Sequence, residues 1–199
     1  MILVYPLRVR RATLINYTYL VVHRASREAL LIDPGAEADV ILEQIRQSNC
    51  SIKAILLSHH HQDHTALASF FANCFQVPVF MSAIEQAYHG FTCDRLQPFT
   101  PGHVLSFGQL SVFPWHTPGH TRGGVCYQVT DHLLRAIPCS LRDVVCALGR
   151  GVIRLICTTA CNSCAGILTP LCGSTRGILM APVRVFRLVM YSITISTSI

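Results

Sequence analysis

The chain has 199 residues, of which 51% are hydrophobic and 13% are charged, and its formal net charge is +6. This length is sufficient for one domain with a hydrophobic core. The charge is uneven, because residues 1–134 hold nine basic and nine acidic residues, whereas residues 135–199 hold seven arginines and one acidic residue, Asp143. The arginines of the second part form no nucleic-acid-binding motif, so we expect no nucleic-acid partner.

The sequence pattern predicts neither a secretory signal nor a membrane span. Residues 1–6 lack a basic region and a long apolar run, and no uninterrupted apolar window reaches the length of about 18 residues that a membrane helix requires. Four widely spaced cysteines precede residue 135, and without a secretory signal they are expected to be reduced: Cys50, Cys74, Cys93 and Cys126. We therefore expect a cytoplasmic protein with no membrane partner.

The first third of the chain predicts strands followed by a helix. Tyr17–His23 and Ala29–Ile32 are apolar and rich in β-branched and aromatic residues, which is typical of strands. Asp33-Pro34-Gly35 ends the second strand. Ala36–Gln47 has the apolar spacing of an amphipathic helix, and Ile52–Leu57 is expected to be a buried strand.

The next segments repeat the same alternation. Residues 65–75 have helical character, residues 77–81 favour a short strand, and residues 82–89 favour a short helix. Three further strands are expected at Val104–Phe107, Leu110–Trp115 and Gly124–Val129. The alternation indicates an α/β or α+β fold with sheet inside and helices outside.

A histidine-rich segment directly follows the predicted strand that ends at Leu57. It runs Ser58-His-His-His-Gln-Asp-His64, and its pattern His-x-His-x-Asp-His is far more specific than a loose histidine cluster. His59 and His61 lie two residues apart and face the same way on an extended loop, while Asp63 and His64 lie within reach of a second position. Imidazole and carboxylate together suit zinc, iron or manganese better than calcium or magnesium.

A second histidine, His120, lies in the turn Thr117-Pro-Gly-His-Thr121, where proline and glycine fix a bend that can hold an imidazole over the first cluster. Two metals held there would activate a water for attack. Other histidines are expected to be structural, solvated or outside the ligand set: His23, His60, His89, His103, His116 and His132.

The chain resembles the metallo-β-lactamase fold family, and within it the glyoxalase II-like thioester hydrolases. The resemblance rests on Ile32-Asp-Pro-Gly35, on residues 58–64 and on residues 117–121, in this order, and it covers about residues 1–134. It implies an αββα sandwich with two zinc ions at one edge of the sheets. By the same resemblance, His59, His61 and His120 would bind the first ion, and Asp63 and His64 the second.

The family pattern stops after Leu134. A Gly-Asp-Thr-Leu-Phe segment, whose aspartate bridges both metals in the family, should follow here, and one further histidine ligand should come later. The sequence instead continues Arg135-Ala-Ile-Pro-Cys-Ser140 and contains no histidine after residue 134. Three cysteines of this part have a spacing that could suggest zinc, but they lack a fourth ligand: Cys157, Cys161 and Cys164.

A shift of the reading frame explains this break. In the shifted frame, each new triplet consists of the third base of one original codon and the first two bases of the next. Read in this way, the boundaries between the codons of Arg135 to Ser140 allow Gly-Asp-Thr-Leu-Phe. In the same frame, the junctions of residues 142–152 allow Gly-Cys-Gly-Val-Cys-x-Gly-Pro-Gly-Gly, which resembles the hydrolases that accompany polyketide synthases. We therefore interpret residues 135–199 as a frameshifted tail, and a divergent but genuine C-terminal region is the alternative.

Two functions follow as expectations. The first is a zinc-dependent hydrolase in which metal-activated hydroxide, oriented by Asp63, attacks the carbonyl of an acyl-glutathione, an acyl-coenzyme A or an acyl group on a carrier protein. Hydrolysis of β-lactams or phosphodiesters, and persulfide oxidation with one iron, are other chemistries of this fold. The second is a truncated, catalytically impaired remnant that binds at most one metal.

Overall fold

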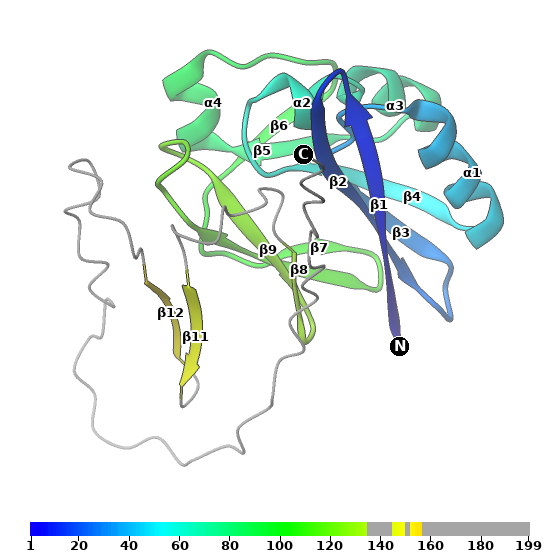
Figure 1. The fold of residues 1–199 in the computed structure, drawn as a ribbon. Coiled ribbons are helices and arrows are strands. Elements are labelled where there is room, and N and C mark those ends of the chain that lie inside the picture. Colours follow the sequence, from blue (N-terminus) through cyan, green and yellow to red (C-terminus); the bar gives the residue numbers. More distant parts are fainter. Residues whose placement is uncertain (135–144, 150–151, 157–199) are drawn as a thin grey trace, which may run out of the picture. The chain divides into compact units, whose positions relative to one another are not determined.

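The computed structural model describes residues 1–134, 145–149 and 152–156, and Figure 1 shows their arrangement. Residues 1–134 belong to one compact unit, and the two short strands at 145–156 belong to another. The second unit contributes an antiparallel pair, β11 (Val145–Gly149) and β12 (Val152–Ile156). No helix among the described residues is long and apolar enough to cross a membrane.

A six-stranded sheet forms the centre of the first unit, with the strand order β1-β2-β3-β4-β5-β6. The first three strands pair antiparallel, and β3 to β6 pair parallel. Its strands are β1 (Ile2–Arg11), β2 (Leu14–His23), β3 (Glu28–Ile32), β4 (Ser51–Leu57), β5 (Val79–Ser82) and β6 (Leu96–Phe99). The parallel strands end at the same edge of the sheet, and the histidine-rich loop leaves β4 there.

A second, antiparallel sheet has the order β10-β9-β8-β7. Its strands are β7 (Leu105–Phe107), β8 (Leu110–His116), β9 (Val125–Val129) and β10 (His132–Leu134). The long loop between β8 and β9 carries the Thr-Pro-Gly-His turn.

The six-stranded sheet is buried on both faces, because successive side chains of a strand point to opposite sides. In β2, Leu20 and Val22 pack into a core shared with the helices, whereas Tyr19 and Val21 pack against the second sheet. The same division holds in β4, where Ile55 and Leu57 face the helices and Ala54 and Leu56 face the second sheet. This two-sided burial explains why residues 54–57 form one continuous apolar run.

Helices cover the first face of the six-stranded sheet (Figure 1). The short helices α2 (Gln62–Thr65) and α4 (Ala83–His89) follow β4 and β5 in the chain, and the two that supply core residues to this face are α1 (Ala38–Ser48) and α3 (Ala68–Phe75). Ile41 and Ile45 of α1, with Phe71 of α3, fill the core beneath them. Residues 1–134 thus form helix, sheet and sheet layers. These are three of the four layers of the expected sandwich.

Each predicted element has a counterpart in the structure, but β1 and β10 were not predicted as separate strands, and two further places differ. The helix expected at residues 65–75 is divided into α2 and α3, and α2 begins inside the histidine motif. Strand β6 was not predicted, and it contains Pro98. An edge strand tolerates proline, since one side of its backbone needs no partner.

Candidate metal centre

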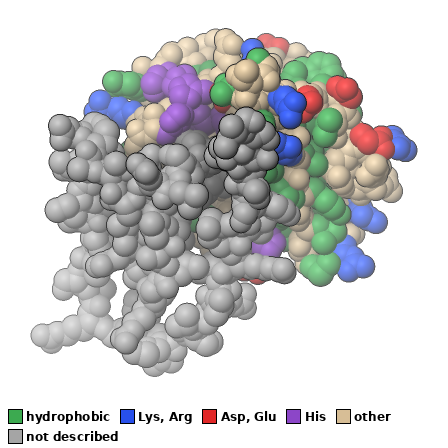
Figure 2. All heavy atoms as spheres, viewed as in Figure 1, with side chains coloured by type: hydrophobic (Ala, Val, Ile, Leu, Met, Phe, Trp, Pro, Cys, Tyr) green, Lys and Arg blue, Asp and Glu red, His purple; other side chains and the backbone are tan. Residues whose placement is uncertain are grey.

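The histidine-rich loop and the β8–β9 loop meet at one edge of the two sheets. The Val125 amide donates to the Ser58 carbonyl at 3.0 Å, and the buried Tyr127 hydroxyl donates to the Leu57 carbonyl at 2.7 Å. These contacts fix the start of β9 to the end of β4. A group of histidine side chains gathers at the surface there (Figure 2).

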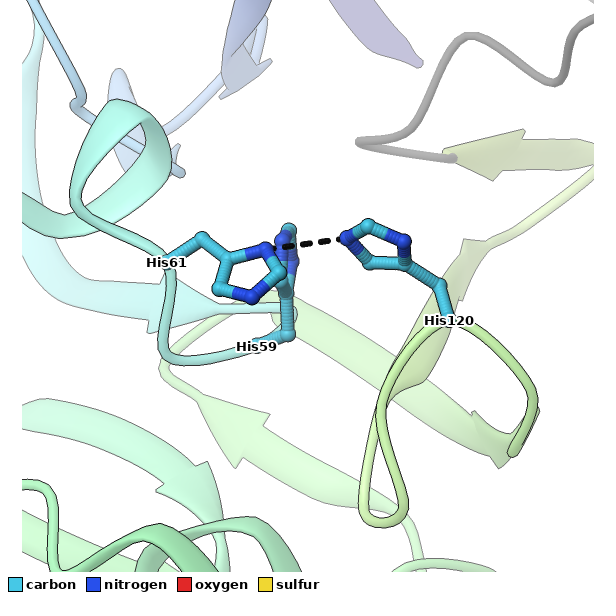
Figure 3. A group of neighbouring side chains, drawn as sticks. All are labelled: His59, His61 and His120. Atoms are coloured by element: carbon cyan, nitrogen blue, oxygen red, sulfur yellow. Dashed lines mark hydrogen bonds between the residues drawn. The ribbon is translucent and has the colours of Figure 1, made fainter.

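Three histidines from the two loops turn their rings toward one another (Figure 3). His59, His61 and His120 each offer one nitrogen, and these three nitrogens lie within 4.8 Å of one another. His61 Nδ1 and His120 Nε2 are 2.9 Å apart and share one hydrogen bond. Three imidazoles that converge in this way match the donor set of a zinc site.

The tautomer of His59 is fixed by two neighbours. The Ser58 hydroxyl donates its single proton to Asp33 Oδ2 at 2.7 Å, so its oxygen can only accept from His59 Nδ1, which lies 2.9 Å away. The proton of His59 therefore lies on Nδ1, and Nε2 keeps its lone pair. This is the tautomer that a metal ligand requires.

The Nε2 atom of His59 is buried and has no hydrogen-bond partner among the described residues. Leaving a buried polar atom without a partner costs free energy, and such atoms in proteins are normally satisfied. A cation bound between His59, His61 and His120 would satisfy it. The residues present therefore fit a metal ion at this position.

The electrostatics of the centre keep its ligands neutral. Burial, followed by the nearness of His64, His61 and His120, lowers the pKa of His59 to about 2. Burial is also the largest cause that lowers the pKa of His61 and the pKa of His120. Neutral imidazoles are the form that binds metal, so the site is prepared for a cation near neutral pH.

His64 and Asp63 lie beside this group but not in it. His64 is buried, and its donor atom groups with those of Asp33 and His59. Its Nδ1 lies 3.4 Å from Asp33 Oδ2, and its Nε2 lies 3.7 Å from Asp63 Oδ2. Burial by itself would lower the pKa of His64, but the two nearby carboxylates raise it. Asp63 Oδ2 accepts a hydrogen bond from Asn16 Nδ2 at 2.5 Å.

Other histidines of the sequence are occupied differently. The His60 ring turns to Glu85, with Nδ1 2.6 Å from Oε1, and it stacks on His89 with ring centroids 3.6 Å apart. The His116 Nε2 atom lies 3.0 Å from the Arg122 carbonyl oxygen. Within residues 1–134, His116 belongs to no group that could hold a metal.

Several residues of the centre were not singled out from the sequence as parts of the site. Ser58 was noted as the start of the metal motif, Asp33 as a strand break and as part of a family motif, and neither was given a role in the site; Asn16 and Glu85 were not noted at all. A signal existed for Asp33, since an acidic residue at the end of a buried strand needs a partner. No sequence pattern indicates Asn16 or Glu85, because both reach the site through tertiary packing.

Comparison with known proteins agrees with this geometry. A family model described as the metallo-beta-lactamase superfamily matches residues 12–135. The chain belongs to this superfamily. The structure of ETHE1 from Myxococcus xanthus is similar, with a TM-score of 0.55 and 25% identity, over 65% of this chain and 55% of that chain. The fold expected for residues 1–134 is thereby confirmed as that of the metallo-beta-lactamase superfamily.

Two relatives in sequence carry functional names. "Probable polyketide biosynthesis zinc-dependent hydrolase BaeB" from Bacillus velezensis is 34% identical over 118 residues, which is 59% of this chain and 52% of that protein. "Hydroxyacylglutathione hydrolase" from Nitrosomonas eutropha is 36% identical over 152 residues, which is 75% of this chain and 54% of that protein. The chain thus spans about half the length of these two relatives.

Proposed function

We propose that this member of the superfamily is a zinc-dependent hydrolase that cleaves thioesters. The proposal depends on one observation, the convergence of His59, His61 and His120 around the buried, unpartnered Nε2 of His59. Zinc is chosen because three imidazoles suit it and because the BaeB relative is named as zinc-dependent.

When bound, zinc supplies Lewis-acid chemistry, which lowers the pKa of water to about 7 and polarises the carbonyl bond under attack. The protein supplies the geometry. Asp33 and Ser58 hold His59 in its ligand tautomer, and the β8–β9 loop brings His120 to the His59–His61 pair.

Asp63 is the catalytic residue of this proposal. Asn16 holds its Oδ2 atom, so the carboxylate has a fixed orientation beside His64. There it would accept a hydrogen bond from the attacking water and orient it. In a second proposed zinc position, Asp63 and His64 would be the ligands: His64 Nε2 lies 3.7 Å from Asp63 Oδ2 and would face the ion, while Nδ1, 3.4 Å from Asp33 Oδ2, would be oriented by that carboxylate.

The substrate class is proposed from the names of the relatives. A hydroxyacylglutathione is a thioester, and a hydrolase of polyketide biosynthesis would meet acyl groups held as thioesters on a carrier. We propose an acyl-glutathione, an acyl-coenzyme A or an acyl carrier protein as the thiol partner.

Metal content and turnover of the full chain test the proposal together. We expect the zinc-loaded chain to hydrolyse at least one thioester of a panel of acyl-glutathione, acyl-coenzyme A and acyl carrier protein, and His120→Ala to bind zinc more weakly and to lose turnover. The exposed His103, changed to alanine, is the matched control and should keep both. Hydrolysis of a β-lactam or a phosphodiester without any thioester cleavage would contradict the thioester assignment.

A second candidate is the impaired remnant that binds at most one metal. It is favoured by the end of the family match at residue 135, immediately before the place where the bridging aspartate is expected. Residues 135–199 contain one acidic residue and no histidine. One zinc per chain with no turnover on the panel would support the remnant over the enzyme.

A further inference from the structure

Glu85 is a buried carboxylate between the two loops that carry the three histidines. It lies in α4, two residues after the helix begins at Ala83, and its side chain is 0% exposed. A charged group is rarely buried so completely unless other groups compensate it. Its partners therefore show what the residue does.

The two carboxylate oxygens of Glu85 bind different loops. Oε1 accepts from the His60 amide at 3.1 Å and lies 2.6 Å from His60 Nδ1. Oε2 accepts from the Gly123 amide at 2.8 Å. His60 lies between His59 and His61, and Gly123 follows His120 by three residues. One side chain thus connects both ligand loops by hydrogen bonds.

The backbone around Glu85 is packed as closely as its side chain. A Cβ atom added to Gly123 would lie 2.1 Å from the Glu85 amide nitrogen, so only glycine fits there. Burial by itself would raise the pKa of Glu85, but the hydrogen bonds from His60 and Gly123 together lower it. The carboxylate is therefore ionised and acts only as an acceptor.

A separate metal site at Glu85 is a weaker interpretation. His60, Glu85 and His89 have donor atoms within 4.8 Å of one another. However, the two imidazoles are stacked with ring planes only 14° apart, so their in-plane lone pairs run side by side instead of converging. The hydrogen bonds to both carboxylate oxygens further favour a structural connection over a ligand.

We propose that Glu85 is a positioning residue that sets the separation between the His59–His61 pair and His120. The inference rests on the proposed metal centre and adds the residue that holds its two ligand loops at a fixed separation. Partners that orient metal ligands typically change metal affinity roughly 10- to 100-fold when they are mutated.

Glu85→Gln is the decisive variant, because an amide has one acceptor oxygen and must present its NH₂ group to one of the two loops. We expect the full chain with Glu85→Gln to fold and to bind zinc about 10- to 100-fold more weakly than the wild type, measured by competition with a chelator. The matched control is Glu43→Gln on α1, where the carboxylate binds Arg46 and Gln47 at the surface. It should bind zinc as the wild type does.

A double-mutant cycle distinguishes positioning from a general loss of stability. If Glu85 acts by placing His120, then His120→Ala should cost about tenfold less zinc affinity in the Glu85→Gln background than in the wild type. A general destabilisation would leave the two costs equal. X-ray absorption should show one imidazole fewer around zinc in Glu85→Gln, with His59 and His61 retained.

The results of these experiments decide whether Glu85 positions the metal ligands. Wild-type zinc affinity in Glu85→Gln, or equal costs of His120→Ala in both backgrounds, overturns the positioning role and leaves the proposed function intact. A wild-type chain that binds no zinc overturns both. If Glu85→Gln does not fold, Glu85→Asp replaces it, since it keeps the charge but withdraws the carboxylate. Failure of both to fold would mean that Glu85 serves the fold instead of the ligands.

Discussion

Substitution of Ser58 by alanine tests the connection that fixes the His59 tautomer. The change removes one hydroxyl that is only 4% exposed and leaves the backbone of the metal loop in place. It abolishes the 2.7 Å hydrogen bond to Asp33 and the 2.9 Å hydrogen bond to His59. The amide of residue 58 still donates to Asp33 Oδ1, so the loop keeps its main anchor.

The magnitude follows from these two contacts. A hydrogen bond to a charged group contributes about 1.5–3 kcal/mol, and a buried donor left without a partner costs about 1–3 kcal/mol. Both apply here, because Asp33 and His59 Nδ1 are buried. We expect Ser58→Ala to lower the free energy of unfolding by about 3 kcal/mol. We also expect zinc affinity to fall at least tenfold, since Nδ1 no longer has the acceptor that directs its proton.

Urea unfolding of the zinc-free chain and chelator competition measure the two effects separately. The control is Ser111→Ala on β8, an exposed serine, which should change neither quantity. Unchanged zinc affinity in Ser58→Ala would refute the reasoning, because it would mean that the His59 tautomer does not depend on Ser58. A lower free energy of unfolding with unchanged zinc affinity would still contradict the role of Ser58 in fixing the His59 tautomer.

Four further outcomes are expected. In Gly35→Ala, the new Cβ would lie 1.7 Å from a backbone oxygen of the metal loop, so zinc binding should be lost, as calorimetry would show. The pKa of His59 is lowered to about 2 in the folded chain. Below about pH 6.5, the pKa of histidine in the unfolded chain, protonation of His59 therefore favours the unfolded state. The free energy of unfolding of the zinc-free chain, measured with urea, should fall by about 1.4 kcal/mol from its value at higher pH by pH 5.5, but should not show this fall in His59→Gln. Burial raises the pKa of Cys93 to about 11, so mass spectrometry should find Cys93 alkylated later than the exposed Cys74. Resequencing codons 130–170 should reveal one slipped base, and an intact frame in independent reads would exclude the frameshift.

The sequence predicted the metal loop well because its chemistry is local. His59 and His61 lie on one short segment after a buried strand, and the Pro-Gly turn before His120 marks a second fixed point. The alternation of strands and helices was likewise predictable from periodicity over residues 17–89. The residues that support the site could not be found in this way, because Asn16 and Glu85 are distant from the motif in sequence and reach it only after packing.

The orientation of Asp63 and His64 depends on where the helix after the histidine-rich loop begins, and hydrophobic periodicity does not predict that residue. The sequence predicted that Asp63 and His64 follow an extended loop, but α2 begins at Gln62. This helical turn directs His64 toward Asp33, 3.4 Å away. The Cys157, Cys161 and Cys164 triplet lies outside the described residues, as does all of residues 157–199.

The three histidines lie on loops that follow strands of two different sheets, which gives a bound ion a mechanical role. His59 and His61 follow β4 of the six-stranded sheet, whereas His120 follows β8 of the four-stranded sheet. An ion between them is a cross-link that closes a loop of about sixty residues, and it stabilises the folded chain by an amount that grows with zinc concentration above its Kd. Removal of zinc would thus weaken the association of the two sheets. Faster hydrogen exchange of the β8 and β9 amides would show this before any catalytic assay could.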